Sequence, residues 1–325
     1  MENRVEGDAS GSLVQLTKLF KRSSEYKALG IKSRQGYDWL ADAACTYVLK
    51  DGRTLGHQQV AHLTVPIIQR VVETIAMGRP AAGKQPELPA TPSKASRIAQ
   101  YLGRLFAWGN RQGHCASNPA RGVRKVKEVG AHRMPDHDAF AAVLQFAREG
   151  ASKKAHTTGS APPYLPAVMV LAYTVRLRGI EVDTLTDAEI LPEGILSNRR
   201  KGSRDNITRW TKDLRQAVDW LQAYRSERMV AHGRPVPIKA GERRLLVSES
   251  GTPLTKSALD TAWQRMIKRA IAESVITEAQ RFALHGLKHR GITDSDDKSA
   301  GGHRTEAMRQ RYDHEVPFVK PPRPR

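Results

Sequence analysis

The chain has 325 residues, of which 53 are Lys or Arg, 33 are Asp or Glu and 39% are hydrophobic, and its net charge is +20. The apolar content supports a sizeable core and excludes a wholly disordered polybasic chain, and two cysteines, Cys45 and Cys115, are too few for a disulfide scaffold or a four-cysteine zinc site. No stretch reaches the roughly 18 apolar residues of a membrane span, and the N-terminus lacks the apolar region of a signal peptide, so we expect a cytoplasmic protein that uses no membrane. The excess of positive charge favours a polyanionic partner, nucleic acid first.

The first 124 residues predict a helical module, because apolar residues recur there at helical spacing. Residues 1–11 are polar and small and predict a flexible tail. The expected helices lie at 13–20, 39–47, 63–77 and 98–108, with a Pro- and Gly-rich loop at 77–96 and a helix end at NPARG (118–122). Lys and Arg lie between the apolar stripes, which suits contacts with phosphates. We therefore expect residues 12–124 to form a DNA-binding domain.

A charged stretch, 125–135, carries little apolar content and predicts a basic linker. The second domain, 136–315, is expected to begin with a helix near Phe140 and to continue with a buried apolar helix over 164–175. The short runs EIL, GILS and NITRW, separated by PEG and KGSRD, predict a small antiparallel sheet within 188–210. Further helical stripes follow at 214–224 and 259–271. Four tryptophans fall at apolar positions and are expected in the core: Trp108, Trp210, Trp220 and Trp263.

Four features of the second domain contain residues suited to phosphate chemistry. RLRGIEV places Arg178 and Glu181 three residues apart, so the carboxylate can orient the guanidinium. RRKGSRD places Lys201 at a turn between the predicted strands. The remaining two pairs are His285 with Lys288 in ALHGLKHRGIT, and His303 with Tyr312, nine residues apart, in GGHRTEAMRQRYDH.

The order and spacing of these residues resemble the tyrosine recombinases, the phage integrase family of site-specific DNA recombinases. That family has an Arg in a TGxRxxE-like segment, a Lys in a β-hairpin, an HxxR motif, and a His or Trp nine residues before a Tyr. The resemblance covers most of the chain. It implies a mainly α fold, with an N-terminal helical core-binding (SAM-like) domain and a mixed α+β catalytic domain that contains a small antiparallel sheet.

The resemblance also implies roles for the residues. Tyr312 would be the nucleophile that forms a 3′-phosphotyrosine, Arg178 and Lys288 would stabilise the phosphate, and Glu181 would support Arg178. Lys201 would protonate the leaving oxygen. His285 would accept the tyrosine proton or bind the phosphate, and His303 would donate to a phosphate oxygen. No metal or other cofactor is expected, because protein cations take that part in the chemistry.

The sequence departs from the family pattern at three points. Lys288 stands where the family has Arg, and Lys lacks the planar fork that binds phosphate bidentately. Arg290, two residues further on, would point elsewhere on a helix. Val175-Arg176 stands where the family has Thr-Gly, and the interval between His285 and His303 is short. These departures bear on turnover rather than on the fold.

Each of these residues also has an interpretation without a catalytic role. Arg178 and Glu181 could form an ordinary surface pair, and Lys201 could be a solvated basic residue or a plain phosphate contact. His285 and His289 could bind a metal with His303 as a third ligand. Tyr312 could be a packed core tyrosine.

The predicted partners are double-stranded DNA and further copies of this chain, as a tetramer in the synaptic complex. The short N-terminal tail predicts binding to core-type sites only. Residues 316–325 are Pro-rich and cannot form a long helix, and we hypothesise that Val316–Val319 docks on a neighbouring subunit. Rival functions are a cleavage-deficient DNA-binding protein of the same fold, a type IB-like topoisomerase, and a basic RNA-binding or ribosome-associated protein.

Overall fold

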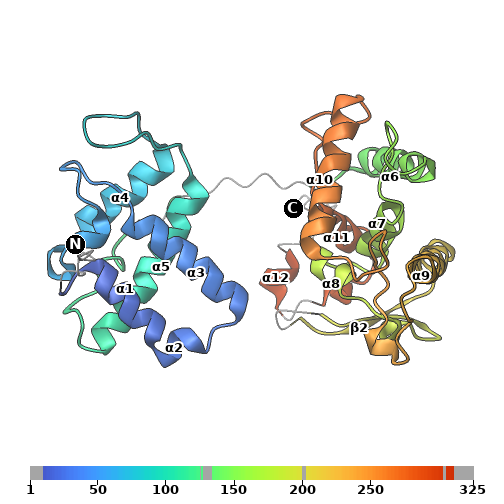
Figure 1. The fold of residues 1–325 in the computed structure, drawn as a ribbon, viewed down its shortest axis with the longest axis horizontal. Coiled ribbons are helices and arrows are strands. Elements are labelled where there is room, and N and C mark those ends of the chain that lie inside the picture. Colours follow the sequence, from blue (N-terminus) through green and yellow to red (C-terminus); the bar gives the residue numbers. More distant parts are fainter. Residues whose placement is uncertain (1–9, 125, 127–133, 200–202, 303–304, 311–325) are drawn as a thin grey trace, which may run out of the picture. The chain divides into compact units, whose positions relative to one another are not determined.

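The structure is a computed structural model that describes residues 10–124, 126, 134–199, 203–302 and 305–310. The chain divides into two compact units, Met1–Gly130 and Ala131–Arg325, and each has a hydrophobic core of its own (Figure 1). Helices dominate both units, and a two-stranded antiparallel sheet lies in the second. The predicted fold class, mainly α with a mixed α+β second domain, is therefore confirmed. Within the described residues, no helix is both long enough and apolar enough to cross a membrane.

The first unit is built around one long helix. Its α-helices are α1 (Leu13–Arg22), α2 (Ser24–Lys27), α3 (Ile31–Cys45), α4 (Val65–Met77) and α5 (Pro92–Arg111), with the 3-10 turns η1 (Leu55–His57) and η2 (Val60–His62). α5 packs against α1, α3 and α4. Its apolar residues recur at helical spacing and are buried, Ile98, Leu102 and Leu105 completely. Ser12 fixes the start of α1, because its hydroxyl accepts the backbone N–H of Gln15.

Two details of this unit differ from the sequence prediction. α5 ends at Arg111, before the NPARG segment, and the chain turns immediately afterwards through Gly113 at a φ of +74°. Trp39 belongs to the expected apolar stripe of α3 but is 50% exposed, with the Lys94 ammonium 5.4 Å from its ring centroid. A cation over the ring face compensates in part for the exposed apolar surface.

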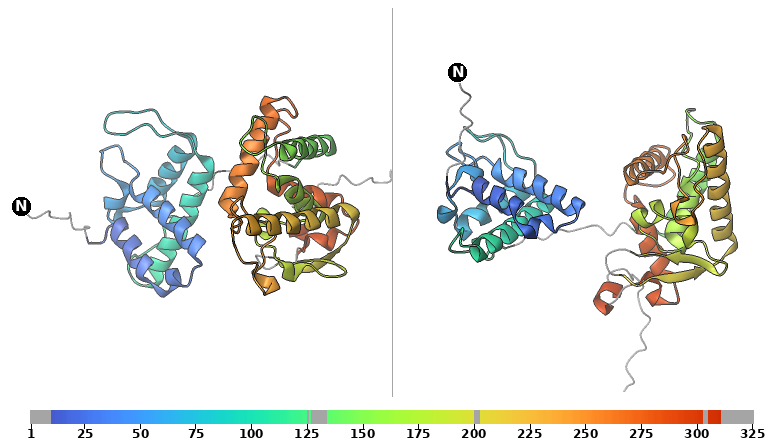
Figure 2. Two further views of the ribbon diagram at one scale, coloured as in Figure 1. Left: turned by 45° about the vertical axis from the view of Figure 1, so that its right-hand side comes forward. Right: turned by 60° about the horizontal axis from the view of Figure 1, so that its bottom comes forward.

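The second unit is built around the apolar helix α7 (Leu165–Thr174). α7 packs against α6 (His137–Ser152), α9 (Lys212–Ala231) and α11 (Leu284–Thr293), and its side chains are buried on several sides. The other α-helices are α8 (Gly179–Asp183), α10 (Lys256–Ala272) and α12 (Glu306–Gln310). The 3-10 turns are η3 (Asp187–Glu189), η4 (Ala240–Glu242) and η5 (Lys298–Gly301). Figure 2 shows α9 alongside this central helix.

The sheet consists of β1 (Gly194–Ser197) and β2 (Asn206–Arg209), paired antiparallel with Gly194 opposite Arg209. A Cβ on Gly194 would lie 2.0 Å from the Thr208 carbonyl oxygen, so this position requires glycine. The EIL run (189–191) was expected to be a strand, but it contributes only one antiparallel bridge, between Ile190 and Ile195. Its first residue, Glu189, ends the η3 turn, which the Thr186 hydroxyl and the Glu189 carboxylate cap.

Trp220 was expected in the core, and this prediction is also wrong, since its side chain is 40% exposed. Its ring stacks on Tyr224, one helical turn later in α9, with the planes 11° apart. The other three predicted core tryptophans are buried or partly buried, at 6% exposure for Trp108 and 1% for Trp263. Helical spacing alone places Trp220 next to the buried stripe of α9 but does not reveal how much of its ring the neighbouring elements leave uncovered.

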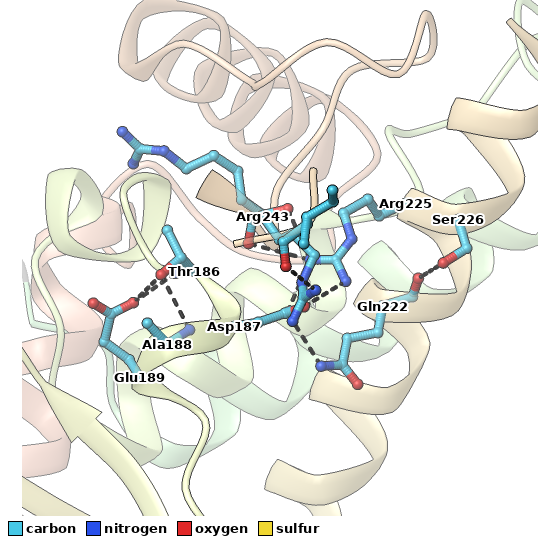
Figure 3. A network of polar contacts seen from close by, with 10 residues as sticks. Thr186, Asp187, Ala188, Glu189, Gln222, Arg225, Ser226 and Arg243 are labelled. Atoms are coloured by element: carbon cyan, nitrogen blue, oxygen red, sulfur yellow. Dashed lines mark hydrogen bonds and ion pairs between the residues drawn. The ribbon is translucent and has the colours of Figure 1, made fainter. Parts of the chain in front are cut away.

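A network of ionic hydrogen bonds joins the sheet region to α9 (Figure 3). The Asp187 carboxylate accepts from Arg225 Nη1 and Nη2, both at 2.9 Å, and from Arg243 Nε at 2.7 Å, and Gln222 donates to it as well. Burial alone would raise the pKa of Asp187, but the hydrogen bonds and charge of Arg225 lower that pKa below its usual 3.8. The network anchors η3, and with it the chain that leads into β1.

Candidate active site

Arg178 and Glu181 meet where α7 passes into α8. Arg178 is the N-cap residue of α8, and the Glu181 carboxylate accepts both its backbone N–H and its Nη1, each at 2.7 Å. The Glu181 side chain is 1% exposed and the Arg178 side chain 13% exposed. The buried carboxylate therefore holds a guanidinium that is still accessible to solvent, and the pair is not an ordinary surface ion pair.

The turn that leads to Arg178 is strained at Arg176, whose φ is +56°. This left-handed region favours glycine, and it is the position where the family pattern has Gly. The Arg176 side chain is partly buried, and its Nη2 donates to Thr208 Oγ1 at 3.2 Å. The departure from the pattern thus keeps the backbone conformation and adds a contact to β2.

Lys288 lies in the middle of α11 and is completely buried, at 0% exposure. The pKa of Lys288 is lowered from 10.5 to about 7, chiefly by burial and next by the nearby charge of Arg199. Glu181 acts in the opposite direction on this pKa, whereas Arg178 and Arg176 lower it. These four side chains come from two stretches of the chain, 176–181 and the residues around Arg199, and Lys288 comes from a third, so the fold gathers several cations around the buried Glu181 carboxylate.

Arg290 does not join this cluster. Its Nε donates to the Asp294 carboxylate at 2.8 Å, one helical turn away, and Asp294 also accepts from the Tyr173 hydroxyl at 2.9 Å. The side chain is thus engaged on another face of α11, as the helical spacing predicts.

His285 lies in the first turn of α11 and is exposed, unlike Lys288 three residues later. Its ring lies 5.0 Å from the ring of His289 and is nearly perpendicular to it. No group of three or more His, Cys, Asp or Glu side chains placed to hold a metal ion occurs among the described residues. The third ligand of the alternative metal site, His303, lies outside them.

Arg199 is the residue of this region that sequence reasoning missed. It is 7% exposed, and its guanidinium donates to the carbonyl oxygens of Val175, Arg176 and Ala300 at 2.9–3.2 Å. Burial lowers the pKa of Arg199 to about 10. A signal was present in the sequence, because Arg199 continues the alternation of Ile195 and Ser197, the inward-facing residues of β1.

The structure therefore brings together Arg178, Glu181 and Lys288 of the predicted residues, and adds Arg176 and Arg199. Of the remaining predicted residues, His285 lies exposed in the first turn of α11, whereas Lys201, His303 and Tyr312 lie outside the described part of the chain, as does Val316–Val319.

The segment that precedes His303 is described up to Gly302. The Gly302 carbonyl accepts the backbone N–H of Arg204 at 2.8 Å, and the Ala300 carbonyl accepts from Asn206 Nδ2 at 2.8 Å. The chain on either side of Lys201 thus contacts the chain that leads into His303.

No protein-family sequence profile matches this chain, and no curated protein matches it in sequence. Its fold is nevertheless that of the tyrosine recombinases, as the resemblance in sequence implies. The integrase of the transposon Tn1549 (residues 82–397), solved with circular intermediate DNA, has a TM-score of 0.71 at 14% identity over 95% of this chain and 97% of that one.

Two lambda integrase structures give the same result. A lambda integrase dimer bound to a COC′ core site has a TM-score of 0.69 at 15% identity, covering 98% of this chain and 82% of that one. A lambda integrase tetramer bound to a Holliday junction has the same TM-score and identity, with 96% and 81% covered. At this identity the likeness establishes the fold, and the chemistry depends on this chain's own residues.

Proposed function

We propose that this protein is a site-specific DNA recombinase that cleaves and rejoins duplex DNA through a covalent 3′-phosphotyrosine. The observation that carries the proposal is the cationic cluster: the Arg178 guanidinium held by buried Glu181, with Lys288 and Arg199 close by. Two carboxylates, buried Glu181 and exposed Asp205, act on these three cations and balance only part of their positive charge, so the cluster favours a bound anion. A phosphodiester fits, because a guanidinium binds two phosphate oxygens at once.

Cleavage begins with attack of the Tyr312 hydroxyl on the scissile phosphorus. A tyrosine hydroxyl has a pKa of about 10 and is a weak nucleophile at neutral pH, so His285 accepts its proton. As the bond from phosphorus to the tyrosine oxygen forms, the bond from phosphorus to the 5′ oxygen breaks. Lys201 gives a proton to that leaving oxygen. Attack by the 5′-hydroxyl of a partner strand reverses these steps and joins the new strand.

The cations stabilise the negative charge that develops on the non-bridging oxygens. Arg178 binds these oxygens directly, His303 donates a hydrogen bond, and Lys288 adds charge from its buried position. A phosphate anion next to the cluster raises the pKa of Lys288 again, so DNA binding itself favours the charged ammonium. No step requires a metal ion.

The proposed partner is duplex DNA, with further copies of this chain. One lambda integrase neighbour is a tetramer on a Holliday junction, and we extend that arrangement to this chain as four protomers on two paired sites. Mass photometry with a synthetic four-way junction tests it, and complexes of no more than one or two protomers contradict it.

The test of cleavage starts from a pool of duplexes with a randomised central region. Duplexes retained by the protein are sequenced, rebuilt with a nick close to each candidate cut position, and incubated with wild-type protein and with Tyr312→Phe. We expect an SDS-resistant protein–DNA adduct for the wild type alone, with mass spectrometry locating the nucleotide on residue 312. Retention without an adduct supports the cleavage-deficient DNA-binding protein, and plasmid relaxation without site preference supports the topoisomerase.

A further inference from the structure

Arg199 links three segments that carry site residues. Its Nη1 donates to the Arg176 carbonyl at 2.9 Å, and its Nη2 donates to the Val175 carbonyl at 3.2 Å and the Ala300 carbonyl at 3.0 Å. The same Nη2 lies 3.2 Å from Asn206 Oδ1 on β2. One guanidinium thus contacts the end of α7, strand β2 and η5.

Its position is explained by the acceptors that it meets. Val175 is the C-cap of α7, where the last carbonyls lack partners within the helix and a cation is favourable. The backbone N–H of Arg199 donates to Asp205 Oδ1 at 2.6 Å, which holds the base of the hairpin in place. Because the side chain is almost completely buried, these hydrogen bonds are shielded from water.

Gly302 forms the other half of the contact. Its φ is +71°, and a Cβ there would lie 2.6 Å from Arg199 Cδ and 2.5 Å from the Arg204 carbonyl oxygen. Any larger residue would push Arg199 or the hairpin away. The aliphatic part of Arg199 can therefore pack this closely on the backbone of residue 302 only when that residue is glycine.

We infer that Arg199 is a positioning residue, which fixes the segments carrying Arg178, Lys201 and His303 relative to one another. Arg178 follows two residues after Arg176, Lys201 lies two residues after Arg199, and His303 follows Gly302 directly. The Nη1 and Nη2 atoms of Arg199 donate to protein acceptors, so its proposed part is to hold these segments in place rather than to bind DNA. The inference rests on the proposed function for its effect on cleavage, but its effect on the free protein is independent of that function.

The test compares Arg199→Gln and Arg199→Lys with wild type on a nicked duplex from the selection above. Arg199→Gln is expected to slow adduct formation at saturating DNA about 100-fold, the effect of a displacement near 1 Å at a reacting centre. The dissociation constant for the duplex is expected to change less than about threefold. Arg199→Lys keeps the charge but not the planar set of donors, so it is expected to remain slow. Arg148→Gln, which removes a charge from an exposed position on α6, is the matched control for net charge.

Gly302→Ala disturbs the same contact from its other side and is expected to slow the adduct step similarly. It keeps the inference testable if Arg199→Gln does not fold. Adduct formation by Arg199→Gln at the wild-type rate, a loss that only follows weaker binding, or full recovery in Arg199→Lys would each overturn the inference.

Hydrogen exchange in the free protein separates this inference from the proposed function. Arg199→Gln is expected to speed exchange at the Arg204 amide, which donates to the Gly302 carbonyl, at least tenfold relative to wild type. If wild type forms no adduct but this exchange increases, the proposed function fails and the structural part of the inference holds. Unchanged exchange overturns the inference whatever the cleavage result.

Discussion

Replacement of Lys288 by Met tests whether the buried ammonium has the environment described above. The pKa of Lys288 is lowered from 10.5 to about 7, chiefly by burial. At 1.36 kcal/mol per pH unit, this difference corresponds to about 5 kcal/mol of unfavourable free energy when the side chain is charged in the folded protein. A Met of similar length removes that cost, so we expect Lys288→Met to unfold with a higher free energy than wild type at pH 7.

The pH dependence gives the sharper readout. Well below pH 7 the lysine is charged in both states and the whole cost is present, whereas at pH 7 about half of the folded molecules have released the proton. Between pH 7 and 10.5 the folded protein releases a proton that the unfolded chain keeps, so wild-type stability rises by about 1.4 kcal/mol per pH unit from this group. The advantage of Lys288→Met is therefore expected to shrink by about 2 kcal/mol between pH 7 and pH 9.

Urea unfolding followed by pulse proteolysis at pH 7, 8 and 9 measures this difference, and the surviving fragment identifies the unit that unfolds. Lys268→Met, on the exposed face of α10, is the matched control for loss of a lysine. A stability difference between wild type and Lys288→Met that does not vary with pH would refute the reasoning, because the ammonium would then carry no cost of burial.

Three further changes test neighbouring features. Glu181→Gln leaves buried cations uncompensated and releases Arg178. We expect it to lower the free energy of unfolding, measured by urea denaturation, by about 3–5 kcal/mol, and to slow adduct formation. Glycine adopts the left-handed conformation at position 176 without strain, whereas alanine does not, so the free energy of unfolding of Arg176→Gly should exceed that of Arg176→Ala by about 1 kcal/mol. Equal free energies for the two variants would show that the backbone is not strained there. Asp187→Asn should cost about 2–4 kcal/mol at pH 7 by removing the ionic partner of Arg225. Because the pKa of Asp187 is lowered, that cost should begin to fall near pH 4 and disappear as the pH passes below the lowered pKa, and a cost that does not change with pH below 4 would exclude the ionic role.

Local contacts account for the structural features around the candidate site that the sequence predicts and the structure shows. Arg178 and Glu181 are three residues apart, and the structure joins them directly. Lys288 and Arg290 are separated by two positions on one helix, and the structure places them in different surroundings. In each case the helical period is sufficient to predict whether the two side chains share a face, because they lie within three residues of each other.

Errors arose where a distant element decides the environment. Trp220 continues the pattern of buried residues on α9, yet its exposure depends on whether another element covers that face. That exposure does not follow from the residues of α9 alone. The difference in the EIL run is local instead, because the capping of η3 by Thr186 and Glu189 takes up the first residue of the run and leaves Ile190 with a single bridge to Ile195.

The amino-acid sequence by itself determined the helical framework, the small sheet and the Arg178–Glu181 pair, since these depend on periodicity and on neighbours a few residues away. Only the tertiary structure decided that Lys288 is buried among arginines, that Arg176 adopts a left-handed backbone, and that Arg199 joins the end of α7 to η5. The physical reason is that burial, electrostatic environment and hydrogen bonds between distant segments depend on which elements pack together, and residue spacing within one element does not contain that information.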